Sequence, residues 1–117
     1  MTESSQSCTL MEKYIRLIQQ GRKSVEARVA IPMFCAWKEG DTVRFFSRRD
    51  PHIYVTIRIA AKRHYKTFRD MLQTEGVDKL IPGVNSIDEG ERLYLEIPKY
   101  AERERQYGVL AFRLELV

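Results

Sequence analysis

The chain has 117 residues and a mass of 13.8 kDa, a length typical of one domain that buries about 65% of the surface of its unfolded chain. Apolar residues make up 44% and aromatic residues 10%, which favours a compact core and excludes a disordered chain. Two cysteines and two histidines exclude a disulfide scaffold and a cysteine-based zinc site, and we expect no metal and no cofactor. Since no apolar run approaches the roughly 18 residues of a membrane span, we expect a cytoplasmic protein that does not enter the membrane.

The formal net charge of +4 is distributed unevenly along the chain. Residues 44–69 carry eight basic side chains against Asp50 alone, whereas residues 70–107 carry nine acids against five bases. A molecule polarised in this way attracts a polyanion to one side. Solvated strand faces without any partner explain the same pattern, and charge alone favours that explanation.

The first part of the chain is expected to be loose and then helical. Residues 1–9 are predicted to be a flexible N-terminus, and residues 10–117 a single domain. Thr9 and Glu12 have the spacing of a capping box, which predicts a helix that ends at Gly21.

Strands follow this helix. Charged and apolar residues alternate over 24–29, which predicts a half-buried strand with a charged outer face. Pro32 interrupts the pattern, and a turn at 40–41 leads into a strand at 42–46. The clearest period of two lies over 53–59 and predicts a further strand.

Two more helices are marked by their N-terminal caps. Thr67 and Asp70 predict a helix that ends at Gly76, and Ser86 and Glu89 form a capping box before another helical stretch.

A charged segment over 100–106 precedes a last strand predicted at 107–116. Strands joined by turns rather than by regular crossover helices favour a mixed α+β fold. We therefore predict a small, mostly antiparallel β-barrel with flanking helices.

The densest polar cluster lies where the first helix meets the first strand, at Gly21-Arg22-Lys23-Ser24-Val25-Glu26-Ala27-Arg28. Gly21 permits a sharp backbone reversal, and Glu26 and Arg28 share one strand face. A lysine beside a carboxylate that an arginine holds can anchor a phosphate, or transfer protons if burial lowers its pKa. A surface ion pair worth at most about 1 kcal/mol explains the same spacing.

The pattern Gly21-x-Lys23-x-x-Glu26-x-Arg28 resembles the signature of the ASCH domain family, whose fold is similar to that of the PUA RNA-binding domains. Further matching positions follow in order: Gly40-Asp41, Phe45, Tyr65, Phe68, Leu72, Glu75-Gly76, Leu80-Ile81-Pro82-Gly83, Tyr100, Glu104 and 107–111. The resemblance implies a PUA-like β-barrel with a basic cleft beside the first helix, into which Lys23, Glu26 and Arg28 project.

The resemblance implies, first, a module that binds RNA, a nucleotide or a modified nucleoside, since family members are linked to RNA and single-stranded nucleic acids. A protein partner is also compatible, because family members are linked to coactivator complexes. The candidate ligand-binding residues are Arg22, Lys23, Ser24, Glu26, Arg28, Trp37, Lys62 and Arg63.

The alternative function is enzymatic. Some small bacterial members resemble amidohydrolases that remove the acetyl group of acetylated cytidine with a Lys, a Thr and a Glu. Lys23 matches the Lys, Glu26 stands at the Thr position, and Glu75 is the match for the Glu. In that case Glu26 activates a water, Lys23 protonates the leaving amine and Arg28 stabilises the oxyanion, without a metal. The sequence does not choose between binding and hydrolysis.

Two further features remain open. Trp37 either stacks a base at the rim of the cleft or covers the core. Lys62 and Arg63 lie in a segment that interleaves basic and aromatic residues, as a strip that follows a phosphate backbone does.

Overall fold

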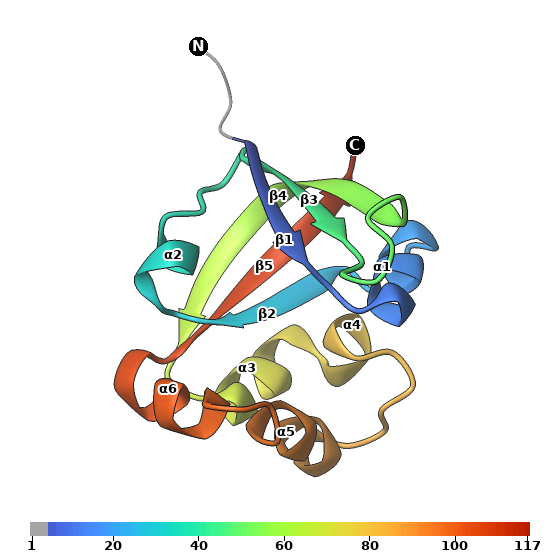
Figure 1. The fold of residues 1–117 in the computed structure, drawn as a ribbon. Coiled ribbons are helices and arrows are strands. Elements are labelled where there is room, and N and C mark those ends of the chain that lie inside the picture. The colour runs from blue at the N-terminus through green and yellow to red at the C-terminus, as the bar shows by residue number, and fades with distance from the viewer. Residues whose placement is uncertain (1–4) are drawn as a thin grey trace.

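A computed structural model describes residues 5–117 as a mixed α+β fold in which one five-stranded sheet curls into a half-barrel (Figure 1). The strands are β1 (Ser5–Thr9), β2 (Val25–Val29), β3 (Thr42–Phe46), β4 (Tyr54–Tyr65) and β5 (Val109–Leu116). The helices are α1 (Glu12–Gln19), α2 (Pro32–Cys35), α3 (Phe68–Glu75), α4 (Val77–Leu80), α5 (Ile87–Leu95) and α6 (Tyr100–Tyr107). No helix within the described residues is long and apolar enough to cross a membrane.

The sheet is mostly antiparallel, as predicted. Its strand order is β1-β3-β4-β5-β2, and only β1 pairs in parallel, with β3. β1 and β2 are therefore the two edges of the half-barrel. The long strand β4 continues beyond the predicted run and changes register between Ile59 and Ala61, where a bulge lets it bend.

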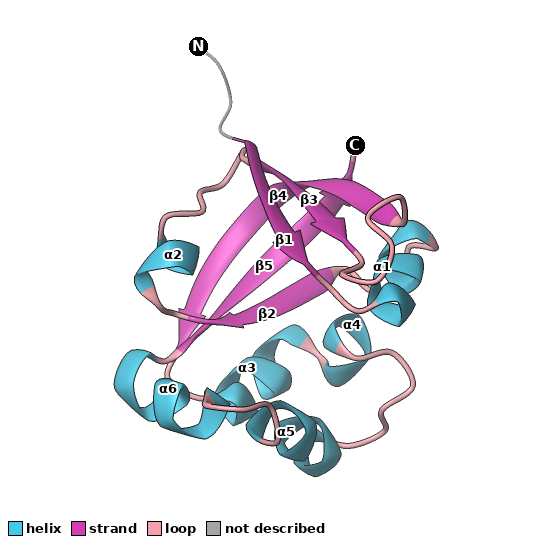
Figure 2. Cartoon of the chain, in the orientation of Figure 1, coloured by secondary structure: helices cyan, strands magenta, loops and turns pink. Residues whose placement is uncertain are grey.

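Each face of the sheet carries its own apolar core. Inside the curl, residues of β3, β4 and β5 pack against α1 and α2, with Phe45, Ile57 and Phe112 at most 1% exposed. On the opposite face, β2 and β5 pack against α3 and α4, with α5 packed on α3 and α6 beside β2. Figure 2 shows this division, with α3, α4, α5 and α6 grouped below the curled strands.

The N-terminal region differs from its prediction. Residues 5–9 form β1, where we expected a loose chain, and residues 1–4 lie outside the described part. Thr9 does not cap a helix: it ends β1, and α1 begins after Met11 without a side-chain cap. Pairing with β3, more than 30 residues away, leaves no local signal in the sequence.

The later caps are confirmed. The Thr67 hydroxyl accepts a hydrogen bond from the Asp70 amide at the start of α3, and the Ser86 hydroxyl accepts one from the Glu89 amide at the start of α5, both 3.1 Å long. The charged segment before the last strand is the helix α6. Gly108, at a φ of 78°, then turns the chain into β5.

Candidate functional site

The site is built at the start of β2, immediately after α1. Gly21 has a φ of 75°, and this left-handed conformation ends the helix and redirects the chain. Lys23 and Glu26, both charged, are only 3% and 6% exposed. The charged face of β2 is therefore not the solvated outer face that the alternation predicts: both faces of this strand are covered.

The Lys23 ammonium is fully engaged by the protein. It donates hydrogen bonds to the carbonyl oxygens of Val25, at 2.6 Å, and Leu80, at 2.7 Å. Its nitrogen also lies 3.1 Å from Glu26 Oε1. Three acceptors match the three N–H groups of an ammonium, so Lys23 fixes the position of Glu26 and ties β2 to α4.

Arg28 holds the other oxygen of the same carboxylate. Its Nε and Nη2 atoms lie 3.0 and 2.7 Å from Glu26 Oε2. The two cations hold the Glu26 carboxylate in one orientation and stabilise its ionised form. With two contacts on Oε2 and one on Oε1, Glu26 keeps room on Oε1 for one more hydrogen bond.

Arg28 also closes the half-barrel. From the edge strand β2 it reaches the other edge strand, where its guanidinium donates to Cys8 Sγ and to the Thr9 carbonyl, each at 3.3 Å. Its guanidinium carbon lies 5.2 Å from the centre of the Phe34 ring and 5.7 Å from that of Phe45. Cation–π contacts of this kind stabilise a desolvated guanidinium.

The charges of the cluster depend on one another. Burial lowers the pKa of Lys23, and the neighbouring Glu26 offsets part of that effect. Burial on its own would raise the pKa of Glu26, but Lys23 and Arg28 bring it below its ordinary value. Burial likewise opposes the charge of Arg28, and Glu26 reverses this so that the pKa of Arg28 is raised. Glu26 is therefore the ionised centre of the cluster.

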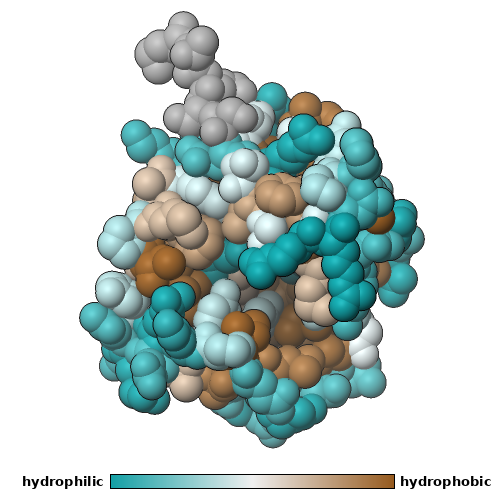
Figure 3. All heavy atoms as spheres, viewed as in Figure 1, coloured by the Kyte–Doolittle hydropathy of each residue, from teal (hydrophilic) through white to brown (hydrophobic). Residues whose placement is uncertain are grey.

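The cluster lies in a cavity of about 890 Å³, which we call the large cavity. Figure 3 shows a hollow between α1 and the lower helices, with hydrophobic side chains inside it and hydrophilic ones at its rim. Its polar and aromatic lining residues are Thr9, Glu12, Lys13, Tyr14, Lys23, Glu26, Arg28, Ser47, Arg48, Arg49, Tyr94 and Tyr100. Five bases against two acids give this lining a formal charge of +3.

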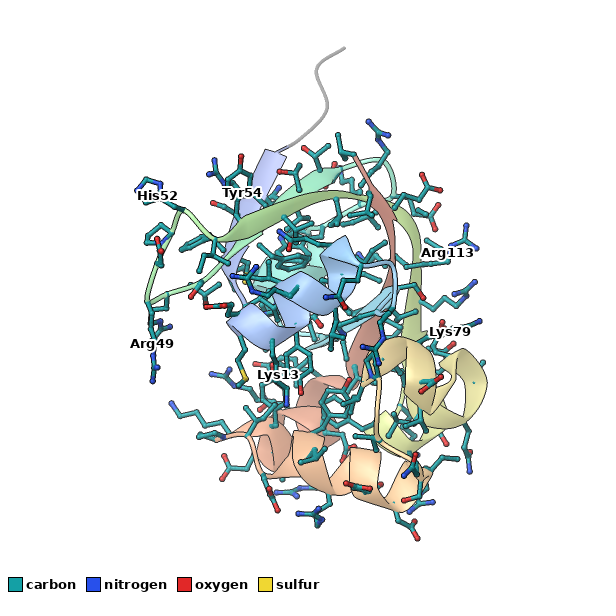
Figure 4. All side chains as sticks on the ribbon, turned by 90° about the vertical axis from the view of Figure 1, so that its right-hand side faces the viewer. Lys13, Arg49, His52, Tyr54, Lys79 and Arg113 are labelled. Atoms are coloured by element: carbon teal, nitrogen blue, oxygen red, sulfur yellow. The ribbon has the colours of Figure 1, made fainter. Side chains whose placement is uncertain are left out.

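Three lining cations were not among the sequence-predicted site residues. Arg48 and Arg49 come from the β3–β4 loop, and Lys13 from α1. Figure 4 shows Lys13 on the underside of α1 and Arg49 extending outward from its loop. The only signal for the two arginines was the basic composition of residues 44–69, which does not indicate what a loop faces.

Other predicted residues lie elsewhere. Trp37 is 3% exposed, and its ring centre lies 5.1 Å from that of Phe34 and 5.3 Å from that of Phe112. It covers the core and does not line the cavity. Lys62 donates to the Cys35 carbonyl at 2.6 Å and does not line the large cavity. Arg22 is exposed and is not part of the cavity lining.

Ser24, Arg63 and Glu75 meet in a different place, a separate cavity of about 290 Å³, which we call the small cavity. The structure therefore does not bring Glu75 together with Lys23 and Glu26. Glu75 accepts hydrogen bonds from the Tyr65 hydroxyl and, at 3.2 and 3.3 Å, from Arg63. Burial and this carboxylate raise the pKa of Tyr65 to about 12.

Comparison with known proteins identifies the family. The ASCH domain profile matches residues 9–117, nearly the whole chain. The chain belongs to the ASCH domain family. This family is PUA-like and is proposed to bind RNA.

Solved structures of ASCH relatives agree with the fold. The crystal structure of hypothetical protein PH0355 has a TM-score of 0.86 and 33% identity, over 97% of this chain and 99% of that one. Protein PF0455 from Pyrococcus furiosus has a TM-score of 0.72 and 30% identity, over 99% and 98%. ASCH from Zymomonas mobilis, at 17% identity over 93% and 65%, shares the fold with a TM-score of 0.62. No curated protein matches the chain significantly.

Proposed function

We propose that this ASCH domain binds single-stranded RNA by holding one nucleotide in the large cavity. The observation that carries the proposal is the buried carboxylate of Glu26, fixed by Lys23 and Arg28 in an open, tyrosine-lined cavity with a cationic rim. A volume of about 890 Å³ is in the range of natural small-ligand sites.

The rim supplies positive charge for phosphates. Among the ion pairs of residues 5–117, none involves Lys13, Arg48 or Arg49. The acid beside Lys13, Glu12, is paired with Arg16 at 2.9 Å. These three cations are therefore available to the backbone of a nucleic acid, whose phosphates dominate affinity.

The walls supply aromatic surface for a base. Tyr94 and Tyr100 are held in place by Phe68, whose ring stacks on theirs with centre distances of 4.7 and 5.8 Å. Burial raises the pKa of both tyrosines, so their hydroxyls stay protonated at neutral pH. Proteins that bind single strands stack unpaired bases on such rings at about 1–3 kcal/mol per base.

Glu26 supplies recognition. Its Oε1 atom accepts from Lys23 alone and has capacity for an N–H donor of the ligand. Cytosine, adenine and guanine each carry an exocyclic amine that can donate to this oxygen, whereas uracil has no exocyclic amine and offers only its ring N3–H. We therefore expect a preference for amino-bearing bases over uracil.

The contacts favour binding over hydrolysis. Amidohydrolysis by the predicted residues needs Lys23 to protonate a leaving amine, and its three N–H groups already have acceptors. Glu75, the remaining candidate acid, lines the small cavity.

We also expect the protein in a reducing compartment, the cytoplasm, because Cys8 and Cys35 are free thiols.

Fluorescence anisotropy with labelled oligocytidylate at several salt concentrations tests the proposal. Wild-type affinity is expected to fall steeply with salt. The R48Q/R49Q double variant should reduce the slope of log K against log [salt] by about 1.4, since each phosphate contact on a single strand contributes about 0.7.

The matched control is K66Q/R105Q, which removes two exposed cations outside both cavities. It should leave the slope unchanged apart from a small long-range effect. Equal slopes for the two double variants, or no RNA binding at low salt, would refute the proposal. Release of cytidine from acetylated cytidine, abolished by E26Q, would instead establish the enzymatic alternative.

A further inference from the structure

The small cavity is lined in part by chain neighbours of residues that line the large one. It is lined by three cations, one acid and two hydroxyl residues: Arg63, Lys79, Arg113, Glu75, Ser24 and Thr74. The Ser24 amide donates to the Lys79 carbonyl at 3.1 Å, next to the bond from Lys23 to the Leu80 carbonyl. Lys23 and Leu80 thus line the large cavity, and their chain neighbours Ser24 and Lys79 line the small one.

The charge of the small cavity is not balanced. Glu75 is its one acid, and the Tyr65 hydroxyl and the Arg63 guanidinium already bind that carboxylate. Neither Lys79 nor Arg113 takes part in an ion pair with any residue from 5 to 117. Figure 4 shows Arg113 and Lys79 on the same edge of the molecule, one above the other. The lining therefore has a formal charge of +2.

We propose that the small cavity is a second binding site, specific for a phosphate group, with Lys79 and Arg113 as its principal cations. Arginine and lysine together bind a phosphate through a planar fork and a point charge. Ser24 and Thr74 add hydroxyl donors. A volume of about 290 Å³ is at the lower limit of the range of ligand pockets and has room for a single phosphate group.

The phosphate site itself does not depend on the proposed function, but the second of its two sources does. The phosphate group has two sources, free phosphate and the backbone of a nucleic acid whose base occupies the large cavity. Both present the same oxygens to the same cations, and the test separates them.

The first part of the test is an NMR titration with inorganic phosphate at constant ionic strength, with chloride as the compensating ion. Wild-type protein is expected to show saturable shifts of the Ser24 and Thr74 amides. In K79Q/R113Q the affinity should fall by about a hundredfold, since two charge-assisted hydrogen bonds are lost and each weakens binding by about tenfold. The control K66Q/R105Q should bind phosphate as the wild type does.

The absence of saturable shifts, or unchanged binding in K79Q/R113Q, would overturn the inference. Lys79 and Arg113 are both exposed, so the double variant is expected to fold. Thermal unfolding checks this. Single K79Q and R113Q variants serve if the double variant is unstable.

The second part identifies the source of the phosphate. If an RNA backbone phosphate occupies the site, K79Q/R113Q should reduce the salt slope of oligocytidylate binding by about 0.7 for that contact. A slope equal to that of the control would assign the site to free phosphate. Amide shifts of Ala27 in the large cavity report the proposed function separately.

Discussion

The substitution E26Q tests whether the buried carboxylate is the centre of the cluster. It keeps the shape of the side chain and removes its charge. Lys23 and Arg28, 3.1 and 2.7 Å from the carboxylate oxygens, then lose their common counter-ion. Removing one partner of a buried ion pair leaves an uncompensated charge and costs about 3–5 kcal/mol.

This loss is large but compatible with folding. At 117 residues, a typical domain has a free energy of unfolding of about 6–18 kcal/mol. The exposed pair between Arg16 and Glu12, with side chains 53% and 47% exposed, provides the control. E12Q should cost less than about 1 kcal/mol, because water already solvates both charges.

The pH dependence follows from the directions of the pKa shifts. The pKa of Glu26 in the folded protein lies below its ordinary value of 4.5, so its ionised form stabilises the fold above pH 4.5. That contribution is lost as the pH falls below 4.5 and through the folded-state pKa. E26Q should lack this acid-side decrease in stability.

Lys23 makes the free energy of unfolding depend on pH in the alkaline range. Burial lowers its folded-state pKa below 10.5, so the unfolded chain binds more protons in the window between the two values and stability rises with pH there. Without Glu26, which raises the pKa of Lys23, the window should extend to lower pH. The stability deficit of E26Q should therefore shrink as the pH increases.

Urea unfolding followed by circular dichroism from about pH 2 to pH 10 covers both the acid-side effect of Glu26 and the alkaline effect of Lys23. A cost of E26Q no larger than that of E12Q, with parallel pH profiles, would refute the account of the cluster.

Three further substitutions test the fold around the site. W37A should cost about 3–5 kcal/mol through a core cavity and leave RNA affinity within a factor of two; a large affinity loss at unchanged stability would assign Trp37 to the site after all. G108A should cost about 1–3 kcal/mol in urea unfolding, because the glycine has a φ of 78° and a Cβ there would lie 2.7 Å from the Tyr65 carbonyl oxygen. Wild-type stability of G108A would contradict the turn geometry. T67A should cost about 1 kcal/mol by the loss of the cap on α3, and no measurable cost would contradict the capping bond.

Alternation and N-cap motifs predicted the strands and helices that short stretches of sequence determine. The alternation over 53–59 identified the first half of β4, and the caps at Thr67 and Ser86 identified the starts of two helices. β1 was missed because its parallel pairing with β3 joins distant segments and its residues have no apolar period.

For the site, spacing along β2 indicated which charges lie together but not what they face. Alternation separates the two faces of a strand, and it does not distinguish bulk solvent from a cavity that other elements cover. Alternation alone therefore places Glu26 on a charged outer face, whereas the family resemblance predicts a cleft; in the structure, α1, the β3–β4 loop and α5 enclose it. Arg48 and Arg49 reach the cavity through a loop whose position depends on the whole fold.

The most direct test of the central claim is a backbone NMR titration of the wild-type protein with cytidine 5′-monophosphate. We predict saturable shifts concentrated at the amides of Ala27, Arg48 and Tyr94, which line the large cavity, and their loss in a refolded, stable E26Q variant. Shifts confined to amides outside that cavity, or none at millimolar nucleotide, would contradict the claim that the enclosed carboxylate and its two cations form a nucleotide site.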